Sequence, residues 1–199
     1  LIVRAIKNSG FENGKDVSIC LDVAANELIK NKKYSIFSSK YISTLNSIKN
    51  YSRLIKKFKI KSIEDPFGEN DWSAWSNLSK KEKIQIVGDD LYVTNLSRLK
   101  IGFLNNSSNS ILIKPNQIGT VTETIEVIKF AQKIGFSTII SHRSGDSEDT
   151  FIADLAVGTG SSQIKTGSLT RSERVSKYNQ LLRIEEKLGR NSKMAKIKI

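Results

Sequence analysis

The chain has 199 residues, of which 38% are hydrophobic and 26% are charged; its 12 glycines and 2 prolines exclude collagen-like and low-complexity disordered proteins. A chain of this length can bury roughly 70% of the surface that it exposes when unfolded, which predicts one domain with a hydrophobic core. The sequence contains no run of 18 apolar residues, so we expect no membrane-spanning segment.

The formal net charge is +12, which raises the question of a nucleic-acid partner because lysine and arginine neutralise phosphates. Lysines outnumber arginines by 24 to 8, and they lie in ones and twos along the whole chain. A dedicated nucleic-acid surface more often combines arginines with interleaved aromatic residues. We therefore expect no nucleic-acid partner, and a basic adhesion or nucleic-acid-binding module is kept as the non-enzyme alternative.

The single cysteine, Cys20, cannot form a disulfide within the chain, and no secretory signal peptide opens the sequence. Both features predict a reducing compartment, and hence a cytoplasmic protein. The first residue is Leu1 and the only methionine is Met194, so we expect the chain to be a fragment of a longer protein.

Six short apolar and β-branched runs are predicted to be strands. In chain order these runs are residues 17–21, 60–63, 84–87, 110–113, 137–140 and 162–164. Helical spacing of apolar residues lies between most of them; the clearest case runs from Val121 to Ala131 and stops at Gly135, a common residue after a helix. A basic, loosely ordered tail is predicted at residues 190–199, after a domain at 1–189.

Each predicted strand is followed closely by a polar residue, and these residues lie between 23 and 42 positions apart. They are Asp22, Glu64, Asp89, Lys114, His142 and Lys165. The spacing fits one β/α unit per step, which implies parallel strands with right-handed crossovers. An open doubly wound sheet and a barrel both satisfy this pattern. Because barrel enzymes collect functional residues from the carboxyl ends of many strands, the polar ends favour an α/β fold that is an incomplete TIM-like (β/α) barrel with six of eight strands.

The three acidic strand ends, Asp22, Glu64 and Asp89, would face one mouth of such a barrel and present carboxylate oxygens. Magnesium prefers oxygen ligands in octahedral geometry and keeps positions open for water or substrate. Acidic residues after strands also serve as turn formers and helix caps. As a set of three they favour a metal site. No glycine-rich phosphate loop follows any strand, so no nucleotide site is predicted.

Two lysines, Lys114 and Lys165, follow apolar runs at other strand ends. Partial burial there would disfavour the charged ammonium and make a neutral amine, which is a competent base, more accessible. The fifth strand end carries the only histidine, His142, followed by Arg143 and Ser144. A guanidinium and a hydroxyl in this position suit a phosphate dianion.

Several blocks in this order resemble the signature blocks of the enolase (phosphopyruvate hydratase) family, from about Asp16 to Gly189. The blocks are Asp22–Ala25, Ser62–Phe67, Val87–Leu91, Leu112–Thr120, Ser141–Gly145, Gln163–Gly167 and Arg174–Glu185. Other families of the wider superfamily share the barrel and the acidic trio, but are not expected to carry the Ser-His-Arg-Ser-Gly block.

The resemblance implies a magnesium-dependent lyase that dehydrates 2-phosphoglycerate to phosphoenolpyruvate in glycolysis. The family's metal ligands match the acidic trio, of which Glu64 and Asp89 are also assigned to substrate binding. Lys114 matches the base that accepts the carbon-bound proton. The remaining matches are to substrate-binding residues: His142, Arg143, Ser144 and Lys165. The resemblance also implies a homodimer in the full-length protein and allows cell-surface or secreted pools beside the cytoplasmic one.

The chain departs from the family pattern in three respects. The catalytic acid and the amino-terminal domain with its mobile loop would lie upstream of residue 1, so we expect the isolated chain to be inactive. Asn26 stands where a small hydroxyl residue is expected, and Asp146 where a glutamate is common. A different lyase or racemase of the same superfamily is kept as the alternative enzyme.

Overall fold

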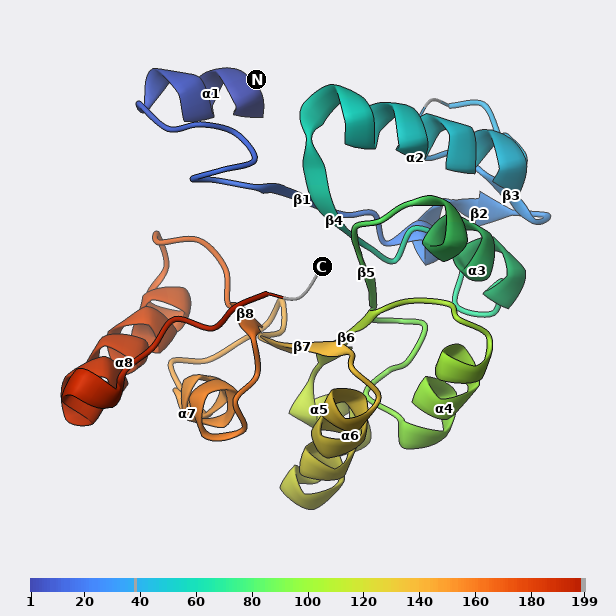
Figure 1. Ribbon diagram of the computed structural model, residues 1–199. Coiled ribbons are helices and arrows are strands. Elements are labelled where there is room, and N and C mark those ends of the chain that lie inside the picture. The colour runs from blue at the N-terminus through green and yellow to red at the C-terminus, as the bar shows by residue number, and fades with distance from the viewer. Residues whose placement is uncertain (38, 198–199) are drawn as a thin grey trace. The chain divides into compact units, whose positions relative to one another are not determined.

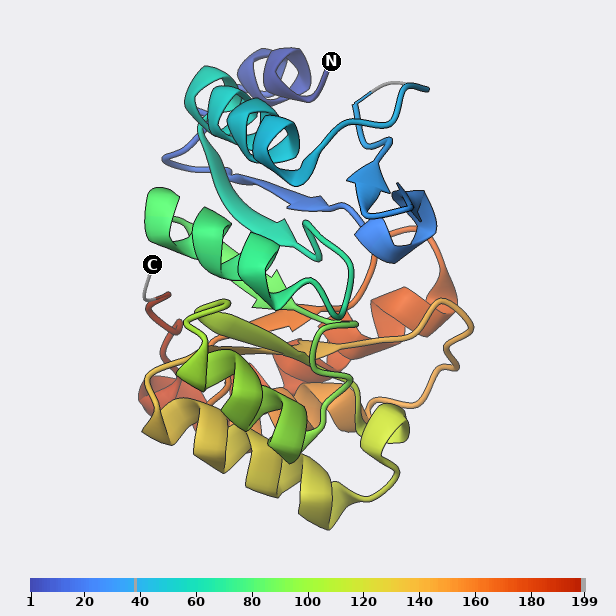
Figure 2. The same ribbon diagram turned by 90° about the vertical axis from the view of Figure 1, so that its right-hand side faces the viewer.

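The structure is a computed structural model that describes residues 1–37 and 39–197. These residues divide into two units. Unit 1 contains Leu1–Tyr92 and Lys100–Asn109, and unit 2 contains Val93–Leu99 and, among the described residues, 110–197. Figures 1 and 2 show the strands and helices of each unit from two directions.

Unit 1 is built on three parallel strands in the order β1-β4-β5. Their bounds are β1 Ile19–Asp22, β4 Ile60–Glu64 and β5 Gln85–Gly88. The helices are α1 Ile2–Asn8, the 3-10 helix η1 Ala25–Leu28, α2 Thr44–Phe58 and α3 Trp72–Lys81. Helix α2 packs on β4 and on α3. An antiparallel hairpin of β2 Ile29–Lys30 and β3 Lys33–Tyr34 is inserted before α2.

Unit 2 repeats the arrangement with parallel strands in the order β6-β7-β8. Their bounds are β6 Ser110–Ile113, β7 Ser137–Ser141 and β8 Gln163–Lys165. The helices are α5 Pro115–Ile118, α6 Val121–Lys133, α7 Phe151–Gly158, α8 Ser172–Leu188 and the 3-10 helix η2 Gly189–Asn191. Helices α7 and α8 lie side by side (Figure 1). Helix α4 Leu96–Leu104 contains the division between the two units.

The sequence explains where the helices begin. Ser43 accepts a hydrogen bond from the Asn46 N–H at the start of α2, and Asp71 does the same for the Ala74 N–H of α3. Thr120 caps α6 by accepting from the Glu123 N–H. Each of these side chains satisfies one of the backbone donors that a helix leaves without an internal partner.

Apolar side chains between the strands and helices form the core of each unit. In unit 1 the rings of Tyr34 and Tyr51 meet Phe67 edge to face, with centroids 5.4 and 5.7 Å apart. Strands β5, β6 and β7 are buried along their whole length, as expected for parallel strands covered on both faces. Burial of the strands fixes their carboxyl ends, where the polar residues stand.

The predicted strands all form, with bounds shifted by at most two residues at either end. The expectation that the first begins at Val17 is wrong: the strand begins at Ile19, because Val17 closes a tight turn in which its carbonyl accepts from the Gly14 N–H at 2.7 Å. The predicted helix from Val121 is confirmed as α6. The domain boundary at residue 189 stays a prediction, and residues 198–199 of the predicted tail lie outside the described residues.

In the described part of the chain, no helix combines the length and the apolar character needed to cross a membrane.

Tyr92 of unit 1 packs so closely against two glycines that neither position has room for a side chain. Its buried ring lies between two glycines, and a Cβ at Gly102 would lie 2.3 Å from its Oη and a Cβ at Gly88 2.6 Å from its ring carbons. Its hydroxyl is held by Ser108 at 2.6 Å, which keeps the ring from moving aside. Gly102→Ala should therefore destabilise the fold by roughly 1–3 kcal/mol, although alanine ordinarily favours a helix over glycine by about 1 kcal/mol.

Chemical denaturation measures this difference. Gly158→Ala is the matched control, because no atom lies within 4 Å of a Cβ built at this last residue of α7. Equal stability changes in the two variants would contradict the packing of Tyr92.

Candidate active site

The acidic strand ends of unit 1 lie on neighbouring strands. Asp22 of β1 and Glu64 of β4 are register partners, and Asp89 directly follows β5, which pairs with β4. Glu64 and Asp89 are buried at 6% and 8% exposure, whereas Asp22 is exposed. The three residues therefore come from adjacent carboxyl ends of one parallel sheet, as the sequence predicts.

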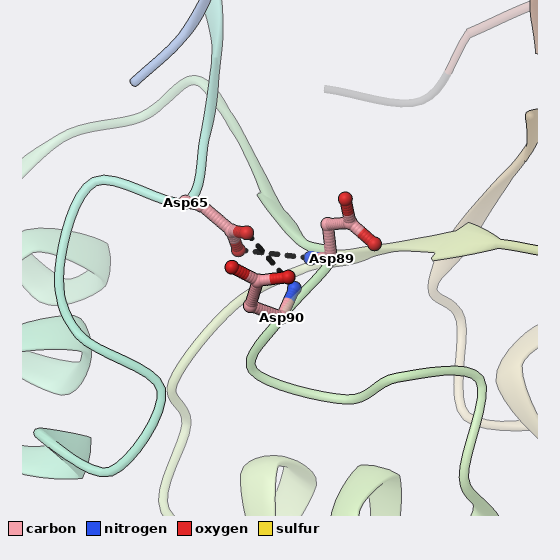
Figure 3. A group of neighbouring side chains, drawn as sticks. All are labelled: Asp65, Asp89 and Asp90. Atoms are coloured by element: carbon pink, nitrogen blue, oxygen red, sulfur yellow. Dashed lines mark hydrogen bonds between the residues drawn. The ribbon is translucent and has the colours of Figure 1, made fainter. Parts of the chain in front are cut away.

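The most compact acidic group in the described residues is a different set that shares one member with the predicted trio. Ligand oxygens of Asp65, Asp89 and Asp90 all lie within 4.8 Å of one another. Figure 3 shows that the Asp65 carboxylate points at the backbone between the other two. Its Oδ1 accepts from the Asp89 N–H at 2.9 Å and its Oδ2 from the Asp90 N–H at 2.8 Å.

Burial is the main reason that the pKa of Asp65 is raised, to about 8. The two backbone N–H groups favour the carboxylate and lower the pKa, while the charges of Asp89 and Asp90 raise it further. Asp65 also adopts a positive φ of 42°, a conformation that aspartate tolerates better than most residues. Asp65 thus acts as a backbone acceptor that sets the course of the chain after β5.

Asn26 reaches the same group from the 3-10 helix η1, which follows β1. Its Nδ2 donates to Asp90 Oδ2 at 2.8 Å, and its Oδ1 accepts from the Glu69 N–H at 2.9 Å. A shorter hydroxyl side chain, which the resemblance led us to expect here, has one oxygen in place of these two groups. All three members of the compact group therefore take part in hydrogen bonds within unit 1.

The acidic residues of unit 1 fit a divalent cation. Carboxylate oxygens are the ligands that magnesium prefers. Besides burial, the charges of Asp89 and Asp90 raise the pKa of Asp65. A cation of charge two would relieve this repulsion. Because both Asp65 oxygens already accept backbone hydrogen bonds, the strand-end carboxylates are the better ligand set.

In unit 2 the remaining predicted residues lie at the carboxyl ends of β6, β7 and β8. Lys114 follows β6 and is half-buried, and its backbone N–H donates to Thr94 Oγ1 at 2.9 Å. Thr94 in turn donates to Gln117 Oε1 at 3.0 Å, so Thr94 holds this segment at Lys114 and again three residues later. Lys165 ends β8 beside Ser141 of β7, and its carbonyl accepts from the His142 N–H at 3.0 Å.

The loop after β7 presents its arginine and serine side chains at the surface. Arg143 and Ser144 are exposed, and Arg143 Nη1 donates to Asn116 Oδ1 at 2.9 Å. Asn116 stands two residues after Lys114, so this contact ties the loop to the end of β6. Unit 2 therefore brings together one lysine from each of two strands with the histidine, arginine and serine between them.

Comparison with known proteins identifies the family. The family described as "Enolase, C-terminal TIM barrel domain" matches residues 1–199. The chain belongs to this enolase barrel family. It is also 76% identical over 198 residues to a protein named Enolase from Pelagibacter ubique (strain HTCC1062). The match covers 99% of this chain and 47% of that protein, so the chain spans about half the length of the relative.

The family match confirms the predicted incomplete (β/α) barrel and the resemblance drawn from the sequence blocks. The acidic residues of this enolase domain belong to unit 1, and the lysines and the histidine loop belong to unit 2.

Sequence reasoning did not single out two buried cations of α8. Arg174 and Lys177 are 8% and 1% exposed, and both contact the loop after β7. They occur in the family block Arg174–Glu185, but the sequence alone does not show that they turn inward. Long-range contacts of this kind become visible only when the helix is placed on the loop.

The ion pair of Asp146 and Lys177 generates a prediction about pH. Burial alone would raise the pKa of Asp146, but hydrogen bonds from the Arg143 N–H, the Lys177 ammonium and the Ser147 N–H lower it below its ordinary value. A carboxyl with a lowered folded-state pKa stabilises the fold at pH values above its unfolded pKa, about 3.9. That contribution is lost as the pH falls through the lower folded pKa.

We expect Asp146→Asn to lower the free energy of unfolding by roughly 1–3 kcal/mol at pH 7, because a charge-assisted acceptor is removed. The difference from the wild type should shrink below about pH 4. Thermal melts between pH 7 and pH 2.5 measure it. Exposed Glu148 lies in the same loop, and Glu148→Gln is the control, with no change expected. A difference that persists unchanged at low pH would contradict the ion pair.

Proposed function

We propose that this chain forms the barrel part of a magnesium-dependent lyase that dehydrates 2-phosphoglycerate to phosphoenolpyruvate, the glycolytic reaction of enolases. The observation that carries the proposal is the gathering of polar residues at the carboxyl ends of parallel strands within each unit. The 76% identity to a protein named Enolase supports it.

In this proposal Asp22, Glu64 and Asp89 hold magnesium, and the last two also approach the substrate. When bound, magnesium would stabilise the negative charge that develops on the substrate carboxylate as the neighbouring carbon loses its proton. Asp65 keeps the chain at Asp89 in place through its two backbone acceptors. Asn26 fixes the adjoining Asp90.

Lys114 is assigned as the base whose Nζ accepts the carbon-bound proton. It stands directly after β6, which is buried along its length, and Thr94 fixes its backbone. Because the helix α5 starts at the next residue, Pro115, the main chain at Lys114 has little freedom to move.

His142, Arg143, Ser144 and Lys165 are assigned to substrate binding. The exposed guanidinium and hydroxyl of Arg143 and Ser144 suit the phosphate dianion, and Lys165 suits the substrate carboxylate. The Ser-His-Arg-Ser-Gly block favours this substrate over those of other superfamily lyases and racemases. A homodimer of the full-length protein and a cytoplasmic location accompany the proposal.

The reaction is tested by following phosphoenolpyruvate formation from 2-phosphoglycerate in the full-length protein that contains this chain. Lys114→Ala should lower turnover by roughly 10²–10⁴-fold, because base catalysis acts in the transition state. Exposed Lys133 on α6 provides the control, and Lys133→Ala should retain full turnover. If Lys114→Ala retains turnover, the base lies elsewhere, and Lys165 is the next residue to test.

The metal assignment is tested by thermal melting. Magnesium at about 100 times its dissociation constant should stabilise the protein by about 2.7 kcal/mol through mass action. Asp89→Ala should remove this stabilisation, whereas Glu126→Ala, at an exposed position of α6, should keep it. An unchanged magnesium-dependent shift in Asp89→Ala would count against the acidic trio.

A further inference from the structure

Helix α8 sends the Arg174 side chain into unit 2 against the loop after β7. The residue is 8% exposed, and fully charged side chains are rarely buried unless acceptors compensate for the lost hydration. Its guanidinium finds these acceptors mainly in the loop itself. Nη1 donates to the Arg143 carbonyl and Nη2 to the Ser144 carbonyl, each at 2.8 Å.

These two contacts hold the main chain of the loop and leave its side chains outward. The residues whose carbonyls Arg174 binds are the two that we assign to the phosphate, and both remain exposed. A planar guanidinium with several donors can bind two successive carbonyls at once, which a single ammonium does with less directional control. Arg174 therefore fixes where the side chains of Arg143 and Ser144 begin.

The same guanidinium also determines where His142 carries its proton. Arg174 Nη1 lies 2.8 Å from His142 Nδ1, and a guanidinium can only donate. Nδ1 must therefore accept, which places the proton of the neutral imidazole on Nε2. His142 is then a hydrogen-bond donor through Nε2 and cannot accept at that atom.

The surroundings of His142 favour this neutral ring on balance. Burial lowers the pKa of His142 most, and the positive charges of Arg174 and Lys165 act in the same direction. The charge of Asp146 and a hydrogen bond with the Thr166 backbone raise the pKa, but they do not outweigh burial.

Gly167 closes the other side of the Arg174 stem. A Cβ there would lie 2.7 Å from Arg174 Cδ and 3.1 Å from His142 Cε1. Gly167 therefore packs so closely against Arg174 and His142 that no side chain fits at this position.

We propose that Arg174 is a positioning residue that fixes the backbone of the loop His142–Ser144 and holds His142 as a neutral Nε2–H donor for a phosphorylated carboxylate substrate. Lys177 supports the other end of the loop by donating to Asp146 Oδ1 at 3.1 Å and to the Ser147 carbonyl. The identity of the substrate rests on the proposed function, whereas the state of the histidine does not.

Nitrogen-15 NMR of the histidine ring in the full-length protein tests the histidine state directly, with His142 assigned by comparison with His142→Gln. The wild type should show a protonated Nε2 and an unprotonated Nδ1 at neutral pH. In Arg174→Met the titration midpoint of His142 should move to higher pH and the two tautomers should mix. Arg190→Met, at an exposed arginine of η2, should leave both features unchanged.

A proton on Nδ1 in the wild type would overturn the inference without any variant. So would a His142 titration in Arg174→Met that matches the wild type. Arg174→Lys is used beside Arg174→Met because it keeps the positive charge but loses the planar guanidinium. In Arg174→Lys the titration midpoint of His142 should lie close to the wild-type value, while the two hydrogen bonds to the loop carbonyls are not fully replaced.

Steady-state kinetics distinguish a failure of this inference from a failure of the proposed function. Arg174→Met should lower kcat/KM for 2-phosphoglycerate by roughly tenfold to a hundredfold, because misplaced binding groups are costly. Wild-type protein with the predicted histidine state and no turnover would overturn the proposed function alone. Turnover in the wild type, with kcat/KM and its pH profile unchanged in Arg174→Met, would overturn the inference alone.

Discussion

The burial of carboxylates at the ends of β4 and β5 is the constraint on which the candidate site of unit 1 depends. Glu64, Asp65 and Asp89 are all removed from water, and the pKa of Asp65 shows that the charged form is costly there. Core packing cannot explain the choice of acidic residues at these positions, since apolar residues of similar size would avoid that cost. Buried carboxylates are retained where they hold a cation or a backbone. Asp65 holds the backbone, and Glu64 and Asp89 are the buried carboxylates that we propose hold the cation.

The two units hold the backbone at their strand ends in similar ways. In each, a strand end carries the residues assigned to chemistry, and a second residue holds the backbone beside them. Asp65 accepts two N–H groups after β5, whereas Arg174 donates to two carbonyls after β7. Thr94 does this on a smaller scale for Lys114. The positions of the residues that we assign to chemistry therefore depend on residues that need not touch a substrate.

The sequence predicts the framework well because parallel strands are short apolar runs and their ends are polar. It predicts the adjacency of Asp22 and Glu64, which follows from register in a parallel sheet. It does not predict the β2-β3 hairpin, whose four residues carry no alternation long enough to detect. The roles of Asp65 and Arg174 were also missed, because both depend on long-range contacts. Asp65 binds backbone groups about 25 positions away, and Arg174 binds carbonyls about 30 positions away.

The central claim is that the strand-end carboxylates hold the metal, while Asp65 is committed to the backbone. Anomalous diffraction from crystals of the full-length protein soaked in Mn²⁺, a substitute for magnesium, locates the ion most directly. If the strand-end carboxylates hold the metal, one strong peak should appear with carboxylate oxygens of Asp22, Glu64 and Asp89 as its protein ligands. A peak ligated by Asp65 and Asp90, or no peak near these acidic residues, would contradict it.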